Sequence, residues 1–172
     1  MGSGVMAHAT TRSYIVQLDI GSIENMYTQA QVDSQHPTGG EVMVRGQMSA
    51  VGGAMADMPG MGGAVTASDR HLEAHICSKA SGAVVQDANP TITLINDATK
   101  NVSQDVQIAV MQGVGAPVGD LHYGNNVVLA PGATYTVLIS LNGETATLHV
   151  KMPTAVTGTT IVGSTTTMPG MP

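Results

Sequence analysis

The stretch that decides the fold is TYTVLISLNGETATLHVKM, which runs from Thr134 to Met152. Apolar residues alternate with polar ones on both sides of the Asn142-Gly143 pair. Successive side chains of a strand point to opposite faces, so this alternation is typical of a strand with one buried face. Asn-Gly favours the two-residue turn of a hairpin. The stretch therefore predicts two antiparallel strands, Thr134–Leu141 and Thr145–Met152.

Similar short runs, separated by turn residues such as Pro131-Gly132, recur along the chain. This spacing favours an all-β sandwich or barrel over any helical fold. A short helical turn is expected only at Tyr27–Val32. The other predicted strands are Ser13–Ile20, Glu41–Met48, Arg70–Cys77, Thr91–Asn96, Val106–Met111 and Asn126–Leu129.

The composition predicts one main domain with an unusual core. The chain has 172 residues, of which 42% are hydrophobic, so it is long enough to bury a core. It contains no Phe and no Trp, so Val, Ile, Leu, Ala and Met must fill the interior. We expect residues 1–12 to be a leader, residues 13–153 to form the β domain, and residues 154–172 to form a tail rich in Thr, Gly, Pro and Met.

Charge and motifs exclude several classes of function. A net charge of -6 argues against nucleic-acid binding, which needs a basic surface. No nucleophile elbow, phosphate loop or zinc-protease helix motif occurs, so we expect a protein that is not an enzyme. Low Lys and Glu with abundant Thr, Gly, Val and Ala is typical of a periplasmic or extracellular protein, although the first residues carry no signal-peptide pattern.

Two segments bring together side chains that bind metals. In HLEAHI, strand alternation places His71, Glu73 and His75 on one face. In MQGVGAPVGDLHYGNN, Met111 precedes a Gly/Pro loop and His122 follows it. Imidazole and carboxylate groups bind Cu(II), and a thioether retains Cu(I), so the five side chains can form one metal site. The alternatives are a solvent-facing polar strand for HLEAHI and a turn residue for His122.

A loop rich in Gly, Ala and Met, residues 49–67, suggests a second role for sulfur. Met55, Met58 and Met61 follow one another at three-residue intervals, and soft thioethers suit Cu(I). A hydrophobic flap that packs on the sheet or on a partner explains the same residues. Cys77 is the only cysteine, so no intrachain disulfide forms, and it is expected to be a small thiol that lines a strand end. No His or Met follows it closely, which excludes a blue-copper site.

HLEAHI, a Met-bearing strand and HYGNNVVLAPGATYTV together resemble the periplasmic iron-transport proteins of immunoglobulin-like fold. The resemblance covers about residues 55–139 and implies an immunoglobulin-like antiparallel β-sandwich. It also implies a copper or iron site made of His71, Glu73, Met111 and His122, a homodimer, and a high-affinity iron permease as partner. The chain departs from the family pattern where His75 replaces an acidic residue and Cys77 replaces a histidine.

The resulting functional prediction is an exported protein that binds a transition metal. Abundant methionine favours copper, in the Cu(I) or Cu(II) state, which the protein would deliver, store or take up. The first alternative is an iron-uptake accessory protein that works with a membrane permease or another metal-accepting protein. The second is a metal-free β-sandwich that serves in adhesion or assembly.

Overall fold

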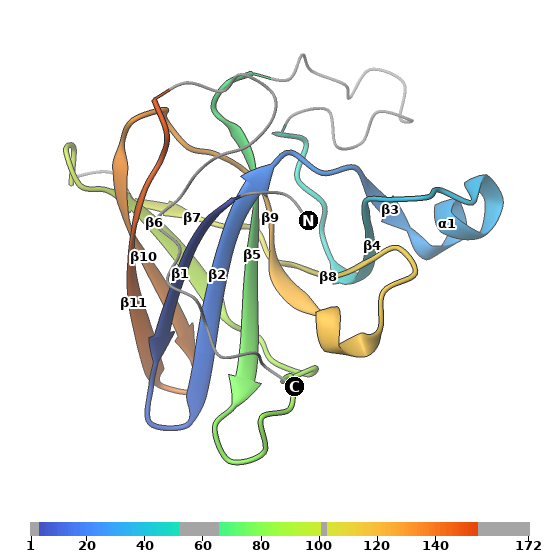
Figure 1. Cartoon of the computed structure of the whole chain (residues 1–172), viewed down its shortest axis with the longest axis horizontal. Coiled ribbons are helices and arrows are strands. Elements are labelled where there is room, and N and C mark those ends of the chain that lie inside the picture. The colour runs from blue at the N-terminus through green and yellow to red at the C-terminus, as the bar shows by residue number, and fades with distance from the viewer. Residues whose placement is uncertain (1–3, 52–65, 101–102, 155–172) are drawn as a thin grey trace.

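The computed structural model describes residues 4–51, 66–100 and 103–154, and it is a sandwich of two β-sheets (Figure 1). The first sheet has seven strands in the order β1-β2-β5-β9-β8-β4-β3, and the second has four in the order β11-β10-β6-β7. The strands of the first sheet are β1 Val5–Thr10, β2 Tyr14–Ser22, β3 Met26–Thr28, β4 Glu41–Gly46, β5 Asp69–Ser78, β8 Ala109–Gly113 and β9 His122–Val128. Those of the second are β6 Thr91–Asn96, β7 Ser103–Asp105, β10 Thr134–Leu141 and β11 Glu144–Lys151.

The predicted hairpin is present as β10 and β11. Leu141 pairs with Glu144, and both turn residues have positive φ, 50° at Asn142 and 78° at Gly143. A two-residue turn of this kind needs positive φ at both central positions, which Asn and Gly tolerate. The predicted β-sandwich is therefore confirmed. Among the described strands, β3 and β4 pair in parallel and the other pairs are antiparallel. The immunoglobulin-like character of the sandwich stays a prediction.

The core lies between the two sheets and contains the aliphatic residues that the composition requires. Alternate residues of the longer strands face inward, as expected for two sheets packed face to face, whereas β4 and β7 contribute no residue to this core. The first sheet contributes Leu18, Ile20, Leu72, Ile76 and Tyr123 among others, and the second contributes Ile92, Leu94, Val137, Ile139 and Leu148.

Several predicted boundaries were wrong. Val5–Thr10, which we expected in a leader, forms β1 and pairs with β2, because Val5 is buried and Ala7 and Ala9 pack against the core. The expected strand Val106–Met111 is β8, which begins only at Ala109. The expected strand Asn126–Leu129 is the end of β9, which starts at His122, so this histidine is not a turn residue.

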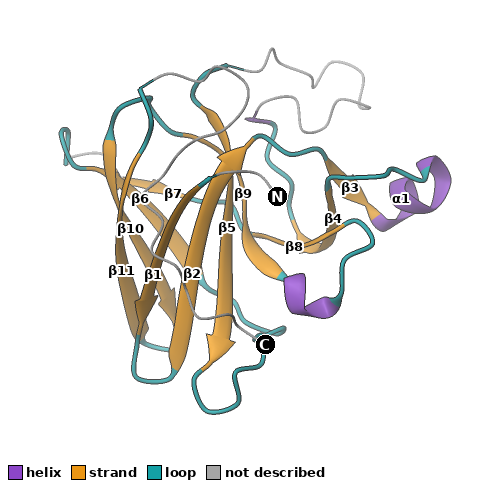
Figure 2. Ribbon diagram, viewed as in Figure 1, coloured by secondary structure: helices purple, strands orange, loops and turns teal. Residues whose placement is uncertain are grey.

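The first sheet extends beyond the second at its β8-β4-β3 end. Helix α1, Gln29–Gln35, and the short 3-10 helix Val118–Asp120 both lie at this end (Figure 2). Thr28 and Gln31 form a capping box at the start of α1, which explains why the helix begins later than the predicted turn. Among the described residues, no helix is long and apolar enough to cross a membrane.

Close pairing of β5 and β9 fixes the geometry of the sheet at the candidate site. A Cβ atom on Gly124 would lie 1.8 Å from the Leu72 carbonyl oxygen. Only glycine permits this approach of the two backbones. Residues on either side of Gly124 in β9 are therefore held in a fixed register against Leu72 and its neighbours in β5.

Candidate metal centre

Strand register gathers the predicted ligands on the face of the first sheet that points away from the sandwich core. Glu73 pairs with Gly124 in β9, and His122 lies two residues before that glycine on the same face. Met111 in β8 is the direct partner of His122, and Met43 in β4 is the partner of Met111. Cross-strand partners project to the same side of a sheet, so the side chains of four neighbouring strands meet.

A compact group of four ligand residues forms where these strands meet. One ligand atom from each of Glu41, His71, Glu73 and His122 lies within 4.8 Å of the others. The His122 Nε2 atom is 3.5 Å from Glu41 Oε2, and the His71 Nε2 atom is 3.8 Å from Glu73 Oε1. The two imidazole rings are 1% exposed. The structure thus brings together three predicted residues and adds Glu41.

Hydrogen bonds orient both histidine rings. The Nδ1 atom of His122 is 2.9 Å from the backbone oxygen of Asp120, which can only accept, so Nδ1 carries the proton. The Nδ1 atom of His71 is 2.8 Å from Asn126 Oδ1, and the Asn126 amide donates to the backbone oxygen of Glu24 at 3.0 Å. Protonation at Nδ1 leaves the Nε2 lone pair of each ring directed at the carboxylates, as in metal-binding histidines.

The polar atoms that face the centre lack hydrogen-bond partners. Within the described parts of the chain, Glu41 Oε2, His71 Nε2 and His122 Nε2 are buried and unsatisfied. Each such atom costs about 1–3 kcal/mol, so three at one point are expensive unless something else binds them. A metal ion would satisfy all three, because imidazole nitrogen and carboxylate oxygen are both good ligands for first-row divalent ions. The residues present therefore fit a metal.

Burial sets the charge state of the metal-free centre. It raises the pKa of Glu41 to about 8, with Glu73 adding a repulsive contribution, and it lowers the pKa of His122 to about 4. It also lowers the pKa of His71. At Glu73 burial acts to raise the pKa, but the hydrogen bond from His75 and the neighbouring imidazoles outweigh it, so the pKa is lowered. At neutral pH the centre holds neutral rings, protonated Glu41 and ionised Glu73.

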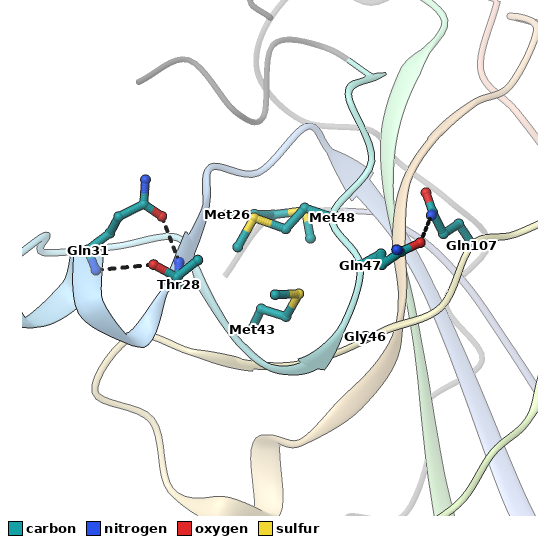
Figure 3. A pocket seen from close by; sticks show the side chains of 8 residues that line it. All are labelled: Met26, Thr28, Gln31, Met43, Gly46, Gln47, Met48 and Gln107. Atoms are coloured by element: carbon teal, nitrogen blue, oxygen red, sulfur yellow. Dashed lines mark hydrogen bonds between the residues drawn. The ribbon is translucent and has the colours of Figure 1, made fainter. Parts of the chain in front are cut away.

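A methionine pocket lies beside this centre. Met26, Met43 and Met48 project toward a common cavity of about 630 Å³ (Figure 3). Met26 and Met43 also pack in one apolar cluster with Met111, which is fully buried. Gln47 and Gln107, which are hydrogen bonded to each other, line one side of the cavity. Thioethers thus line a pocket that adjoins Met111, the register partner of His122, on the β4 and β3 side.

The remaining predicted residues are placed differently. His75 lies outside the group of four. It lies beside Asp19, a residue that the sequence did not predict as part of a site. Cys77 is buried near the end of β5. Met55, Met58 and Met61 lie outside the described residues.

Comparison with protein families gave one match. The family model described as "Fe2+ transport protein" matches residues 32–166 of the chain. That range contains all four strands that carry the centre and Met111, namely β4, β5, β8 and β9. No curated protein and no solved structure matches.

Proposed function

We propose that this chain, which belongs to the family of Fe2+ transport proteins, is an accessory protein of iron transport. Its buried centre would hold one transition-metal ion. The ion would be bound by His71, His122, Glu41 and Glu73, with Met111 beside them. The observation that carries this proposal is the pair of buried, unsatisfied Nε2 atoms, oriented by their Nδ1 hydrogen bonds and facing an equally unsatisfied carboxyl oxygen.

Copper is the ion that we propose for this centre. Two imidazoles and a carboxylate suit Cu(II), and the thioether of Met111 suits Cu(I). Met111 is the register partner of His122, so sulfur and imidazole come from adjacent positions of β8 and β9. A mixed ligand set retains copper in both oxidation states, which suits a carrier rather than an enzyme. Such a carrier would act outside the cytoplasm and pass its ion to a membrane permease or another acceptor.

Ferrous iron as the bound cargo is the second candidate. Two histidines with a carboxylate are a ligand set of non-haem Fe(II) sites. The centre supplies this set, with Glu41 as an additional oxygen donor. Under this alternative Met111 is only a packing residue of the methionine cluster. Replacing Met111 with leucine therefore distinguishes the two ions.

The test uses the full chain after removal of metal with a chelator. His71→Ala and His122→Ala should each lower Cu(II) affinity at least tenfold, or ~1.4 kcal/mol. His149→Ala is the control, because His149 is exposed on β11 of the other sheet. Isothermal titration that gives the parent isotherm for both site variants would refute the centre.

Met111→Leu should weaken Cu(I) binding at least tenfold and leave Cu(II) binding within about threefold, because only Cu(I) depends on the thioether. Competition with a Cu(I)-selective chelator measures the first, and titration the second. Tighter Fe(II) than copper binding, unaffected by Met111→Leu, would replace copper by iron as the occupant.

A further inference from the structure

We propose that Asp19, Glu73 and His75 form a second metal position, which lies beside the buried centre and shares Glu73 with it. Its ligand class is a first-row divalent cation, because it offers carboxylate oxygen and imidazole nitrogen and no sulfur. The sharing of Glu73 rests on the proposed function of the buried centre, whereas the second position itself does not.

The three side chains come from two paired strands. Asp19 in β2 is the direct partner of Glu73 in β5, and His75 follows Glu73 on the same face. The His75 Nε2 atom is 3.3 Å from Glu73 Oε2 and 3.9 Å from Asp19 Oδ2. One ligand atom from each residue lies within 4.8 Å of the others. Movements of about an ångström would bring all three onto one ion, because ligand bonds to such ions are about 2.0–2.2 Å.

Glu73 faces both positions with different oxygens. Its Oε1 atom lies 3.8 Å from His71 in the buried centre, and its Oε2 atom lies 3.3 Å from His75. A carboxylate in this orientation can bridge two ions, each bound by one oxygen. The rings of His75 and His122 have centroids only 5.2 Å apart, so ions at the two positions would be near neighbours.

Exposure differs between the two positions in a way that suggests an order of loading. The His71 and His122 side chains are 1% exposed, whereas those of His75, Asp19 and Glu73 are 16%, 24% and 28% exposed. An ion that arrives from solvent can therefore reach Asp19 and His75 while the buried imidazoles are still covered. Transfer inward would then need only an exchange between the two oxygens of Glu73.

A second residue supports Asp19 in this orientation. The Gln17 amide donates a hydrogen bond of 2.8 Å to Asp19 Oδ2, and Gln17 is the strand partner of His75. The amide bonds the same oxygen that faces His75, which fixes the carboxylate and leaves that oxygen a second lone pair for an ion. The alternative is that the cluster is only an ion-pair network, in which His75 carries a proton between two carboxylates. Metal stoichiometry separates the two explanations.

The experiment titrates the metal-free full chain with Co(II) and follows visible absorption and heat. The parent should bind two Co(II) ions per chain. The double variant Asp19→Asn/His75→Gln should bind one, with a dissociation constant within about threefold of that of the buried centre in the parent. The control is Asp97→Asn/His149→Gln, an Asp and a His that both contact Thr136 on the second sheet, and it should still bind two ions. With Cu(II), the parent and this control should both show an electron paramagnetic resonance spectrum broadened by two adjacent spins, and Asp19→Asn/His75→Gln should not.

Failure of this inference and failure of the proposed function give different results. One ion in the parent, lost in His71→Ala/His122→Ala and retained in Asp19→Asn/His75→Gln, would overturn the second position and leave the buried centre. One ion retained in His71→Ala/His122→Ala and lost in Asp19→Asn/His75→Gln would support the second position and refute the buried centre. Thermal unfolding of each variant identifies any loss that is due to misfolding.

Discussion

Replacing Glu41 with glutamine should make the metal-free protein more stable while weakening its hold on metal. The pKa of this carboxyl is about 8 in the folded protein, against 4.5 for the ordinary value. Between these values only the folded chain keeps the proton, so stability falls as the pH rises, by about 1.4 kcal/mol per pH unit. The cost is on the order of 3 kcal/mol at pH 7 and under about 1 kcal/mol at pH 5. Glutamine has the same shape and no charge, so it removes this cost.

Urea unfolding in the presence of a chelator, at pH 5 and pH 7, measures the effect. Any pH-independent effect of the amide cancels when the two pH values are compared, so the gain should be larger at pH 7 by about 2 kcal/mol. Asp87→Asn, whose side chain is fully exposed, is the control and should give the same change at both values. A gain for Glu41→Gln that does not grow with pH would show that the carboxyl is ionised in the folded protein, and would refute the argument.

Two further predictions concern His122 and Gly124. The pKa of His122 is about 4 in the folded protein, against 6.5 for the ordinary value, so between these values only the unfolded chain protonates this ring. As the pH falls from 6.5 to 4, the parent should therefore lose stability relative to His122→Gln by about 1.4 kcal/mol per pH unit. Urea midpoints that stay parallel over this range would contradict burial of the neutral ring. Gly124→Ala should cost more than about 4 kcal/mol, because the new Cβ would overlap the Leu72 carbonyl, whereas Gly119→Ala, with nothing within 4 Å, should be nearly neutral in thermal unfolding.

Local patterns predicted the parts of the site that depend on neighbouring residues. His71, Glu73 and His75 lie on one strand face because alternation is a property of the strand itself. Met111 and His122 lie side by side because the intervening loop returns the chain antiparallel to itself. In the same way the Asn142-Gly143 pair was enough to predict the hairpin.

Glu41 and Asp19 were missed because pairing between distant strands brings them to the site. Glu41 reaches the centre through the pairing of β4 with β8, and Asp19 reaches Glu73 through the pairing of β2 with β5. Nothing in the local sequence of either strand determines its neighbour. A useful signal was available in EVMVRG, where Glu41 and Met43 share a face that contains both a charge and a soft ligand.

The separation of the metal centre from the sandwich core has an evolutionary consequence. The ligands lie on the outer face of the first sheet, and the residues that hold the two sheets together lie on the inner face of the same strands. A lineage could therefore exchange a ligand without losing the packing that lets the chain fold. Selection for a different ion and selection for a stable scaffold act on alternate residues of one strand, and each can proceed while the other is held constant.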